Sequence, residues 1–90
     1  MYTRDTTVCN ESGLHARPAS DFVRAAGKFK SNITICRTGG DAPVNAKSII
    51  LLLSLGLGKG TKITIRAEGE DEVQTVDALV ALIEGGFGEL

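Results

Sequence analysis

The 90-residue sequence is poor in aromatic and sulfur-containing residues: it has no tryptophan, one tyrosine, three phenylalanines, two cysteines and one methionine. So few aromatic side chains argue against a stacking platform for single-stranded nucleic acid. The two cysteines, Cys9 and Cys36, match no metal-ligand spacing and are too few for a disulfide framework. We therefore expect no metal site, no nucleic-acid partner and a reducing compartment.

The sequence also lacks an excess of either charge and lacks a long apolar run. The sequence has ten basic and eleven acidic residues, and the net charge of −1 argues against the generally basic surface that binds nucleic acid. The longest apolar run, residues 49–53, is far too short to span a bilayer, and no apolar run follows a basic N-terminal start. These absences predict a cytoplasmic protein with neither a secretory signal nor a membrane segment.

The length and the apolar periodicity predict one two-layer domain over residues 1–90, because a chain of this size buries only about 60% of its unfolded surface and has no room for two cores. We expect strands over residues 3–9, 32–36, 42–45 and 61–67, and helices that start at residues 16, 49 and 70–72 and end near residues 27, 56 and 85. The order βαββαβα predicts an α+β open-faced sandwich, in which helices cover one face of a four-stranded antiparallel sheet.

The third predicted strand is short and follows a hairpin turn at residues 38–41. It contains Pro43, which has no N–H to donate on either side, and this places the strand at an edge of the sheet. The periodicity predicts that the following apolar residues face the core: Ala19, Phe22, Val23, Ala26, Phe29, Ile33, Ile35, Leu52, Leu55, Ile63, Ile65, Val73, Val76, Leu79, Val80 and Ile83.

The only histidine, His15, stands where a turn passes into the first helix. Pro18 fits the first turn of a helix, where the N–H it lacks would have no partner, so His15 is predicted to cap the helix that Ala16 and Arg17 begin. A helix N-terminus offers free N–H groups and a partial positive charge, which makes it an anion site. The anion that this arrangement suggests is phosphate.

A neutral imidazole nitrogen is a competent nucleophile near pH 7, and Arg17 can neutralise a dianion with a planar fork of donors. A cation in the first turn of a helix is electrostatically misplaced, which suggests that an anion is meant to join it. The alternative is that His15 is an ordinary structural residue, and a buried His15 would support that alternative. No general base lies near His15 in sequence, so no hydrolase triad is predicted.

Ser48 is predicted to cap a short helix over residues 49–55, which Gly56 closes. The helix is apolar on nearly every side, so burying Leu52 and Leu55 leaves some of its other apolar residues exposed as an interaction patch: Ile49, Ile50, Leu51 and Leu53. The residue chemistry favours Ser48 as a simple cap, although a phosphoserine at a helix N-terminus would also be tolerated.

The loop over residues 56–61 contains Gly58-Lys59-Gly60-Thr61, which invites comparison with a nucleotide-binding loop. A Walker loop needs Gly-Lys followed directly by Ser or Thr and a glycine five residues before its last, whereas residue 53 is leucine. We therefore interpret residues 56–61 as a flexible connection between a helix and a strand, and we expect no cofactor.

Two segments, Gly13 to Ala19 and Asn45 to Ile50, followed by Ser54-Leu55-Gly56, resemble the two signatures of the HPr family. These are the histidine-containing phosphocarrier proteins of the bacterial phosphoenolpyruvate-dependent sugar phosphotransferase system, with close nitrogen-branch relatives. The resemblance covers nearly the whole chain. It implies a four-stranded sheet of order 1-4-2-3, which also places the third strand at an edge.

By this resemblance, His15 takes a phosphoryl group on Nδ1 from the phosphohistidine of enzyme I and passes it to IIA proteins or domains. Arg17 and the amides of Ala16 and Arg17 would stabilise the phosphate. Ser48 matches the regulatory serine that a dedicated kinase phosphorylates in many bacteria. The docking surface would consist of an apolar part and a basic rim: Ile49, Ile50 and Leu53, with Arg24, Lys28 and Lys59.

The resemblance thus implies a carrier rather than a turnover enzyme, and we expect a monomer. Its expected partners are enzyme I and IIA proteins, with a serine kinase or phosphorylase and a transcription regulator as further candidates. The alternative is a mainly regulatory binding module controlled through Ser48. The C-terminal residues 81–89 are similar to nitrogen-branch members and Arg17-Pro18 to the sugar branch, so both branches stay open. The hairpin near residues 39–41 is longer, and the short helix more aliphatic, than in many members.

Overall fold

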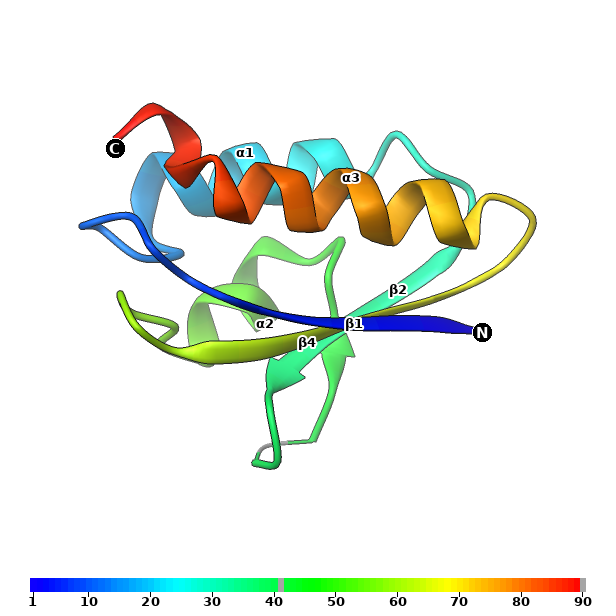
Figure 1. Cartoon of the computed structure of the whole chain (residues 1–90), viewed down its shortest axis with the longest axis horizontal. Coiled ribbons are helices and arrows are strands. Elements are labelled where there is room, and N and C mark those ends of the chain that lie inside the picture. The colour runs from blue at the N-terminus through cyan, green and yellow to red at the C-terminus, as the bar shows by residue number, and fades with distance from the viewer. Residues whose placement is uncertain (41, 90) are drawn as a thin grey trace.

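The computed structural model of the chain describes residues 1–40 and 42–89, and it has the predicted order of elements (Figure 1). Asp41, the last residue of the predicted hairpin turn, and Leu90, the last of the predicted tail, lie outside the described residues. The elements are β1 (Tyr2–Thr7), α1 (Ala16–Ala26), β2 (Asn32–Arg37), β3 (Val44–Asn45), α2 (Ile49–Ser54), β4 (Lys62–Glu68), α3 (Glu72–Glu84) and the 3₁₀ turn η1 (Gly86–Gly88).

The four strands form one antiparallel sheet of order β1-β4-β2-β3, which confirms the predicted fold class and sheet order. β4 pairs with β1 on one side and with β2 on the other, with Ile65 opposite both Arg4 and Ile35. β3 lies at an edge, as Pro43 predicts, although Pro43 itself precedes the two-residue strand.

Several predicted boundaries differ from the structure, most of all those of β1, β3 and the C-terminal tail. β1 ends at Thr7, although Val8 still exchanges hydrogen bonds with Thr61 and Gly60 at 2.9 and 2.7 Å. β3 is restricted to Val44–Asn45. The C-terminal tail contains the 3₁₀ turn Gly86–Gly88, where the sequence predicted no regular element.

The helices cover one face of the sheet, and α1 and α3 lie side by side and run in opposite directions (Figure 1). The core between the two layers takes alternate residues of the strands and the inner faces of the helices, among them Phe22, Ile35, Ile65 and Leu79, all fully buried. Val23 and Phe29 are partly buried and pack against this core. The alternation therefore separates a buried apolar face from an open polar face, as period-two strands require.

The prediction that Val73 faces the core is wrong, because its side chain is 50% exposed. The inward position in the first turn of α3 belongs to Thr75, which is fully buried and donates its hydroxyl to the Asp71 carbonyl at 2.7 Å. At 3.6 residues per turn, Thr75 shares a face with Leu79 and Ile83, and Val73 falls outside the centre of that face. The stripe Val76, Leu79, Val80 and Ile83 is buried as predicted.

One carboxylate, that of Asp71, joins the segment between α1 and β2 to the start of α3. Asp71 accepts hydrogen bonds from the amides of Lys30 and Ser31 at 2.9 and 3.0 Å, and from the hydroxyls of Ser31 and Thr75. These bonds, the Ser31 hydroxyl foremost, lower the pKa of Asp71 to about 2. The backbone of the loop after β4 also approaches Ser31 closely at Gly69, where an added Cβ would lie 2.7 Å from the Ser31 hydroxyl oxygen.

Candidate functional site

His15 occupies the cap position of α1, as the sequence predicts, and its side chain is exposed. Its backbone is extended, with φ −129° and ψ 162°, and its imidazole makes no capping hydrogen bond. The next residue, Ala16, has a φ of 50°, in the left-handed region that residues with a Cβ rarely adopt. The helix therefore begins with a strained residue directly behind the histidine. Burial of His15 would have supported a purely structural role, and His15 is exposed.

The first turn of α1 leaves donors free for a ligand. Arg17 is exposed, and neither its side chain nor that of His15 forms a hydrogen bond or ion pair within residues 1–40 and 42–89. Pro18 has no N–H, and the first intrahelical amide bond runs from Ala19 to the His15 carbonyl at 3.4 Å. Pro18 and Ala19 are buried, so the turn that carries Arg17 rests on the core. The amides of Ala16 and Arg17 are left as donors at the positive end of the helix.

The loop before His15 is fastened to the segment that follows α2. Leu14 is fully buried and donates its amide to the Leu57 carbonyl at 2.8 Å. Gly13 has a φ of 68°, and a Cβ at this position would lie 2.5 Å from the Leu57 carbonyl oxygen and 2.8 Å from the Cα of Gly58. Only glycine fits so close an approach. The contact joins the histidine loop to the helix that Ser48 caps, which the sequence had separated by more than thirty residues.

The C-terminal tail also holds this loop, through Glu89, which the sequence did not single out. The carboxylate accepts hydrogen bonds from the Ser12 amide at 3.0 Å, the Ser12 hydroxyl at 2.9 Å and the Asn10 side-chain amide at 3.1 Å. These bonds, led by the one from the Ser12 amide, lower the pKa of Glu89. No local sequence signal predicts a contact between residues almost eighty positions apart.

Ser48 caps α2 as predicted: its hydroxyl accepts a hydrogen bond from the Leu51 amide at 3.2 Å. Leu52 and Leu55 are buried at 0% and 8% exposure, while four neighbours remain exposed by 36% to 77%: Ile49, Ile50, Leu51 and Leu53. This confirms the prediction that α2 presents an apolar patch. Gly56, with a φ of 62°, follows the helix at the position where left-handed residues end helices.

The three basic residues predicted to surround the patch lie in different places. Lys59 is in the loop after α2, where its ammonium pairs with Glu11 at 3.2 Å, close to the histidine loop. Arg24 lies in the last turn of α1 and faces Asp21 of the same helix at 3.8 Å. Lys28 lies beyond the end of α1, which at eleven residues is about 16 Å long. Lys28 is therefore at the opposite end of this helix from His15.

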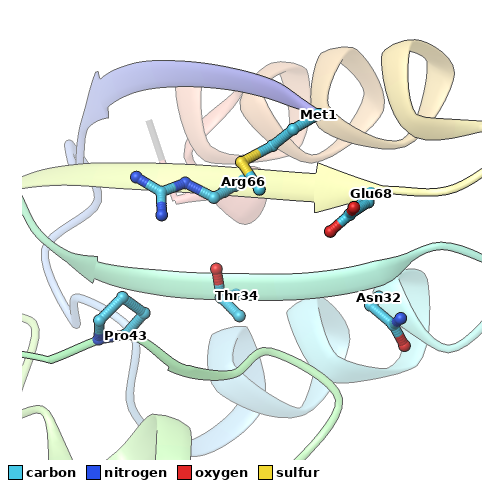
Figure 2. A pocket seen from close by; sticks show the side chains of 6 residues that line it. All are labelled: Met1, Asn32, Thr34, Pro43, Arg66 and Glu68. Atoms are coloured by element: carbon cyan, nitrogen blue, oxygen red, sulfur yellow. The ribbon is translucent and has the colours of Figure 1, made fainter.

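A shallow hollow exists elsewhere, on the open face of the sheet (Figure 2). It is lined by side chains from β2, β4 and the two segments beside them: Met1, Asn32, Thr34, Pro43, Arg66 and Glu68. None of the residues predicted to carry function lines it.

Within the described part of the chain, no three His, Cys, Asp or Glu side chains gather as a metal site. Nor does any helix in residues 1–40 and 42–89 combine the length and apolarity needed to cross a membrane.

The comparisons with known proteins agree with this fold. The family model described as the PTS HPr component phosphorylation site matches residues 2–85. The chain therefore belongs to the HPr family of phosphocarrier proteins.

Individual relatives are similar over nearly their full length. The chain is 48% identical over 83 residues to the phosphocarrier protein HPr of Haemophilus influenzae, which covers 92% of this chain and 95% of the relative. A crystal structure of HPr-C-His from Thermoanaerobacter tengcongensis matches with a TM-score of 0.92 and 45% identity, over 100% of this chain and 99% of the other. A crystal structure of an HPr dimer from the same organism matches with a TM-score of 0.77 and 46% identity, over 93% and 94% of the two chains.

Proposed function

We propose that this protein carries a phosphoryl group on His15, accepting it from the phosphohistidine of enzyme I and passing it to IIA proteins or domains. The observation that carries the proposal is the exposed His15 at the start of α1, followed by an exposed Arg17 whose guanidinium has no partner in residues 1–40 and 42–89. Membership of the phosphocarrier family supports the same role. The protein acts as a carrier with a covalent intermediate, not as a turnover enzyme.

The transfer needs little from the protein beyond placement and charge. The lone pair of the neutral His15 Nδ1 attacks phosphorus, the P–N bond of the donor breaks, and its electron pair returns to the donor imidazole. Arg17 and the free amides of Ala16 and Arg17 hold the oxygens of the phosphoryl group at the positive end of α1. Because His15 is exposed, the same nitrogen is open to the donor and then to the acceptor.

The test is incubation of the protein with phosphoenolpyruvate and its cognate enzyme I. We expect one acid-labile phosphate on the wild-type protein and none on His15→Ala. A phosphate uptake that persists in His15→Ala would contradict the proposal. Tyr2→Phe is a suitable control, because it removes only the hydroxyl that donates to Asp77 at the start of β1, away from His15.

A second role is supported by Ser48, whose hydroxyl caps α2 beside the exposed apolar patch Ile49, Ile50, Leu51 and Leu53. Phosphorylation of Ser48 by a serine kinase would add about −1.5 to −2 charges at a helix N-terminus, which tolerates them, next to the surface that docks partners. The fold would persist while docking of enzyme I or of a transcription regulator would change. Ser48→Asp should therefore keep the fold and bind enzyme I more weakly, and unchanged affinity would contradict this role.

Three basic residues are also proposed to contact docking partners: Arg24, Lys28 and Lys59. Lys59 is tied to the histidine loop by its ion pair with Glu11. The protein acts in the cytoplasm, where phosphoenolpyruvate is available. It acts as a monomer, although one solved relative is described as a dimer. Light scattering of the purified protein at several concentrations distinguishes the two states.

A further inference from the structure

The C-terminal tail of the protein folds back onto the loop that leads to His15. The Glu89 carboxylate receives hydrogen bonds from the Ser12 amide, the Ser12 hydroxyl and the Asn10 side-chain amide, at 3.0, 2.9 and 3.1 Å. The Asn10 amide also donates to the Gly13 carbonyl at 2.9 Å, which closes the turn on itself. In Figure 1 the 3₁₀ turn η1 (Gly86–Gly88) lies at the same end of the molecule as the start of α1. We call this set of bonds the Glu89 clasp.

Two features of the segments that form the clasp are energetically unfavourable: a strained backbone at Phe87 and an unsatisfied buried oxygen on Asn10. Phe87 has a φ of 54°, a backbone conformation in which side chains with a Cβ are strained, while its ring packs against the core. Asn10 is fully buried, and its Oδ1 finds no hydrogen-bond partner within the described residues. Its side-chain amide cannot be turned over, because both of its donor bonds point at oxygens, those of Gly13 and Glu89. Strain persists only where the surrounding contacts over-determine the geometry, and strained residues cluster at functional sites; an unsatisfied buried polar atom likewise calls for an explanation.

Charge complementarity does not explain the clasp. The three donors on Glu89 are neutral groups, so the contact is not an ion pair. A carboxylate near a site for a phosphoryl group repels the incoming anion, so its presence there must bring a different benefit. What the carboxylate supplies is geometric: two oxygens that accept bonds from both Asn10 and Ser12. It thereby fixes the turn that ends immediately before Gly13 and Leu14, the residues that lead into His15.

We infer that Glu89 is a positioning residue for phosphoryl transfer, holding the turn at residues 10–13 so that His15 is presented in its reactive pose. The inference rests on the proposed function. It assigns no contact between Glu89 and the phosphoryl group. Glu89 acts through Ser12 and Asn10, and the loop is held at its other side by the bond from Leu14 to Leu57. Loss of the clasp should therefore slow the chemical step and leave the docking patch on α2 intact.

The test compares Glu89→Gln with the wild-type protein. The amide keeps the size of the side chain but brings an NH₂ group against donors, so part of the clasp must open. Glu70→Gln is the matched control, because Glu70 is an exposed residue in the loop between β4 and α3, remote in the fold from Ser12. Two quantities are measured: hydrogen exchange of the Ser12 amide by NMR, and the kinetics of phosphorylation by enzyme I and phosphoenolpyruvate.

In Glu89→Gln we expect the Ser12 amide to exchange about tenfold faster, because its acceptor is weakened. We expect kcat for phosphorylation to fall about tenfold, since small misplacements of a reacting group are costly, while KM for the carrier stays unchanged. Ser12→Ala removes one bond of the clasp without altering the tail, and it should lower kcat in the same direction by a smaller factor. Glu70→Gln should match the wild type in both measurements.

Each other outcome contradicts the inference in a distinguishable way. Unchanged exchange at Ser12 in Glu89→Gln would show that the clasp does not form. Faster exchange with unchanged kcat would show that the clasp only fastens the tail. A rise in KM without a fall in kcat would place Glu89 in docking instead of positioning. If the wild-type protein accepts no phosphate at all, the proposed function is overturned, and this inference with it.

Discussion

The two helix starts on the functional side of the molecule share a backbone conformation and differ in their side chains. His15, at φ −129° and ψ 162°, caps α1 without a side-chain hydrogen bond, whereas Ser48, at φ −105° and ψ 113°, caps α2 by accepting the Leu51 amide. A missing cap costs a helix about 1 kcal/mol. At α2 the protein's own hydroxyl satisfies the helix. At α1 the donors are left for a ligand, which is what an anion carrier requires.

The residues that follow the two caps also differ in chemistry: one helix begins with an exposed cation and the other with exposed aliphatic side chains. After His15 comes the exposed cation Arg17, at a helix end that disfavours cations until an anion is bound. After Ser48 come exposed aliphatic side chains, with Ile50 the most exposed at 77%. One helix start therefore suits chemistry on a charged group, and the other suits contact with a protein surface. The bond from Leu14 to Leu57 at 2.8 Å links the two in one structure.

Apart from the complete loss of transfer in His15→Ala, the largest effect expected from this comparison is on Arg17. In Arg17→Ala, phosphoryl transfer to His15 should be slowed about 100-fold, because a donor aimed at developing phosphate charge is lost. Rapid-quench kinetics with enzyme I measures the rate. Arg66→Ala, which removes an exposed arginine from the open face of the sheet, is the control and should transfer at the wild-type rate. Equal rates in the two variants would remove Arg17 from the site.

The next effect concerns the approach of the histidine loop to the segment after α2. Gly13→Ala should destabilise the protein by about 3 kcal/mol, because the residue has a φ of 68° and its Cβ would lie 2.5 Å from the Leu57 oxygen. Gly39→Ala is matched to it, with a φ of 73° and open space around it, and should cost about 1 kcal/mol. Urea unfolding measures both. Equal losses would show that the close approach contributes nothing.

A smaller effect concerns what each of the two caps contributes to the free energy of unfolding. Ser48→Ala should lower the free energy of unfolding by about 1 kcal/mol, because the Leu51 amide loses its acceptor. His15→Ala should leave stability nearly unchanged, since the imidazole makes no capping bond. Phosphoryl uptake should show the reverse order, with His15→Ala inactive and Ser48→Ala active. A stability loss in His15→Ala as large as that in Ser48→Ala would contradict the comparison.

The smallest effect is confined to acid and concerns the contact of Asp71 with the segment between α1 and β2, which we expect to be structural only. The folded-state pKa of Asp71, about 2, lies below the ordinary value of 3.8. Its contribution to stability is therefore complete above pH 3.8 and is lost as the pH falls toward 2. Thermal unfolding followed between these pH values should show a shallower loss in Asp71→Asn than in the wild type. Phosphoryl transfer at neutral pH should be the same in both.

The parts of this account that the sequence predicted are those that local patterns determine. Pro18 places His15 at a helix cap, Ser48 precedes an apolar run, and Leu52 and Leu55 share the buried side of α2. Each of these follows from residues within one or two turns of one another. The sheet order came from the family resemblance, because strand pairing over sixty residues has no local signal.

The features that the sequence did not predict depend on contacts between distant segments. Thr75 is tolerated on the inner face of α3 because its hydroxyl donates to the carbonyl and the carboxylate of Asp71 there. The φ of 50° at Ala16 reflects constraints from the whole loop, since alanine has no preference for that region. Glu89 reaches Ser12 only after the complete fold has brought the tail across α1's start. Such contacts are set by tertiary structure and have no local sequence signal.

The central claim is that His15 at the uncapped start of α1 is the phosphoryl acceptor. The most direct test is NMR of the ¹⁵N-labelled protein after exposure to phosphoenolpyruvate and enzyme I, with phosphorus detected on the imidazole. We predict a phosphorus–nitrogen coupling at Nδ1 of His15, with the amide signals of Ala16 and Arg17 shifted and that of Leu51 unchanged. A protein that takes up no phosphate, or that takes it up on Ser48 alone, would contradict the claim.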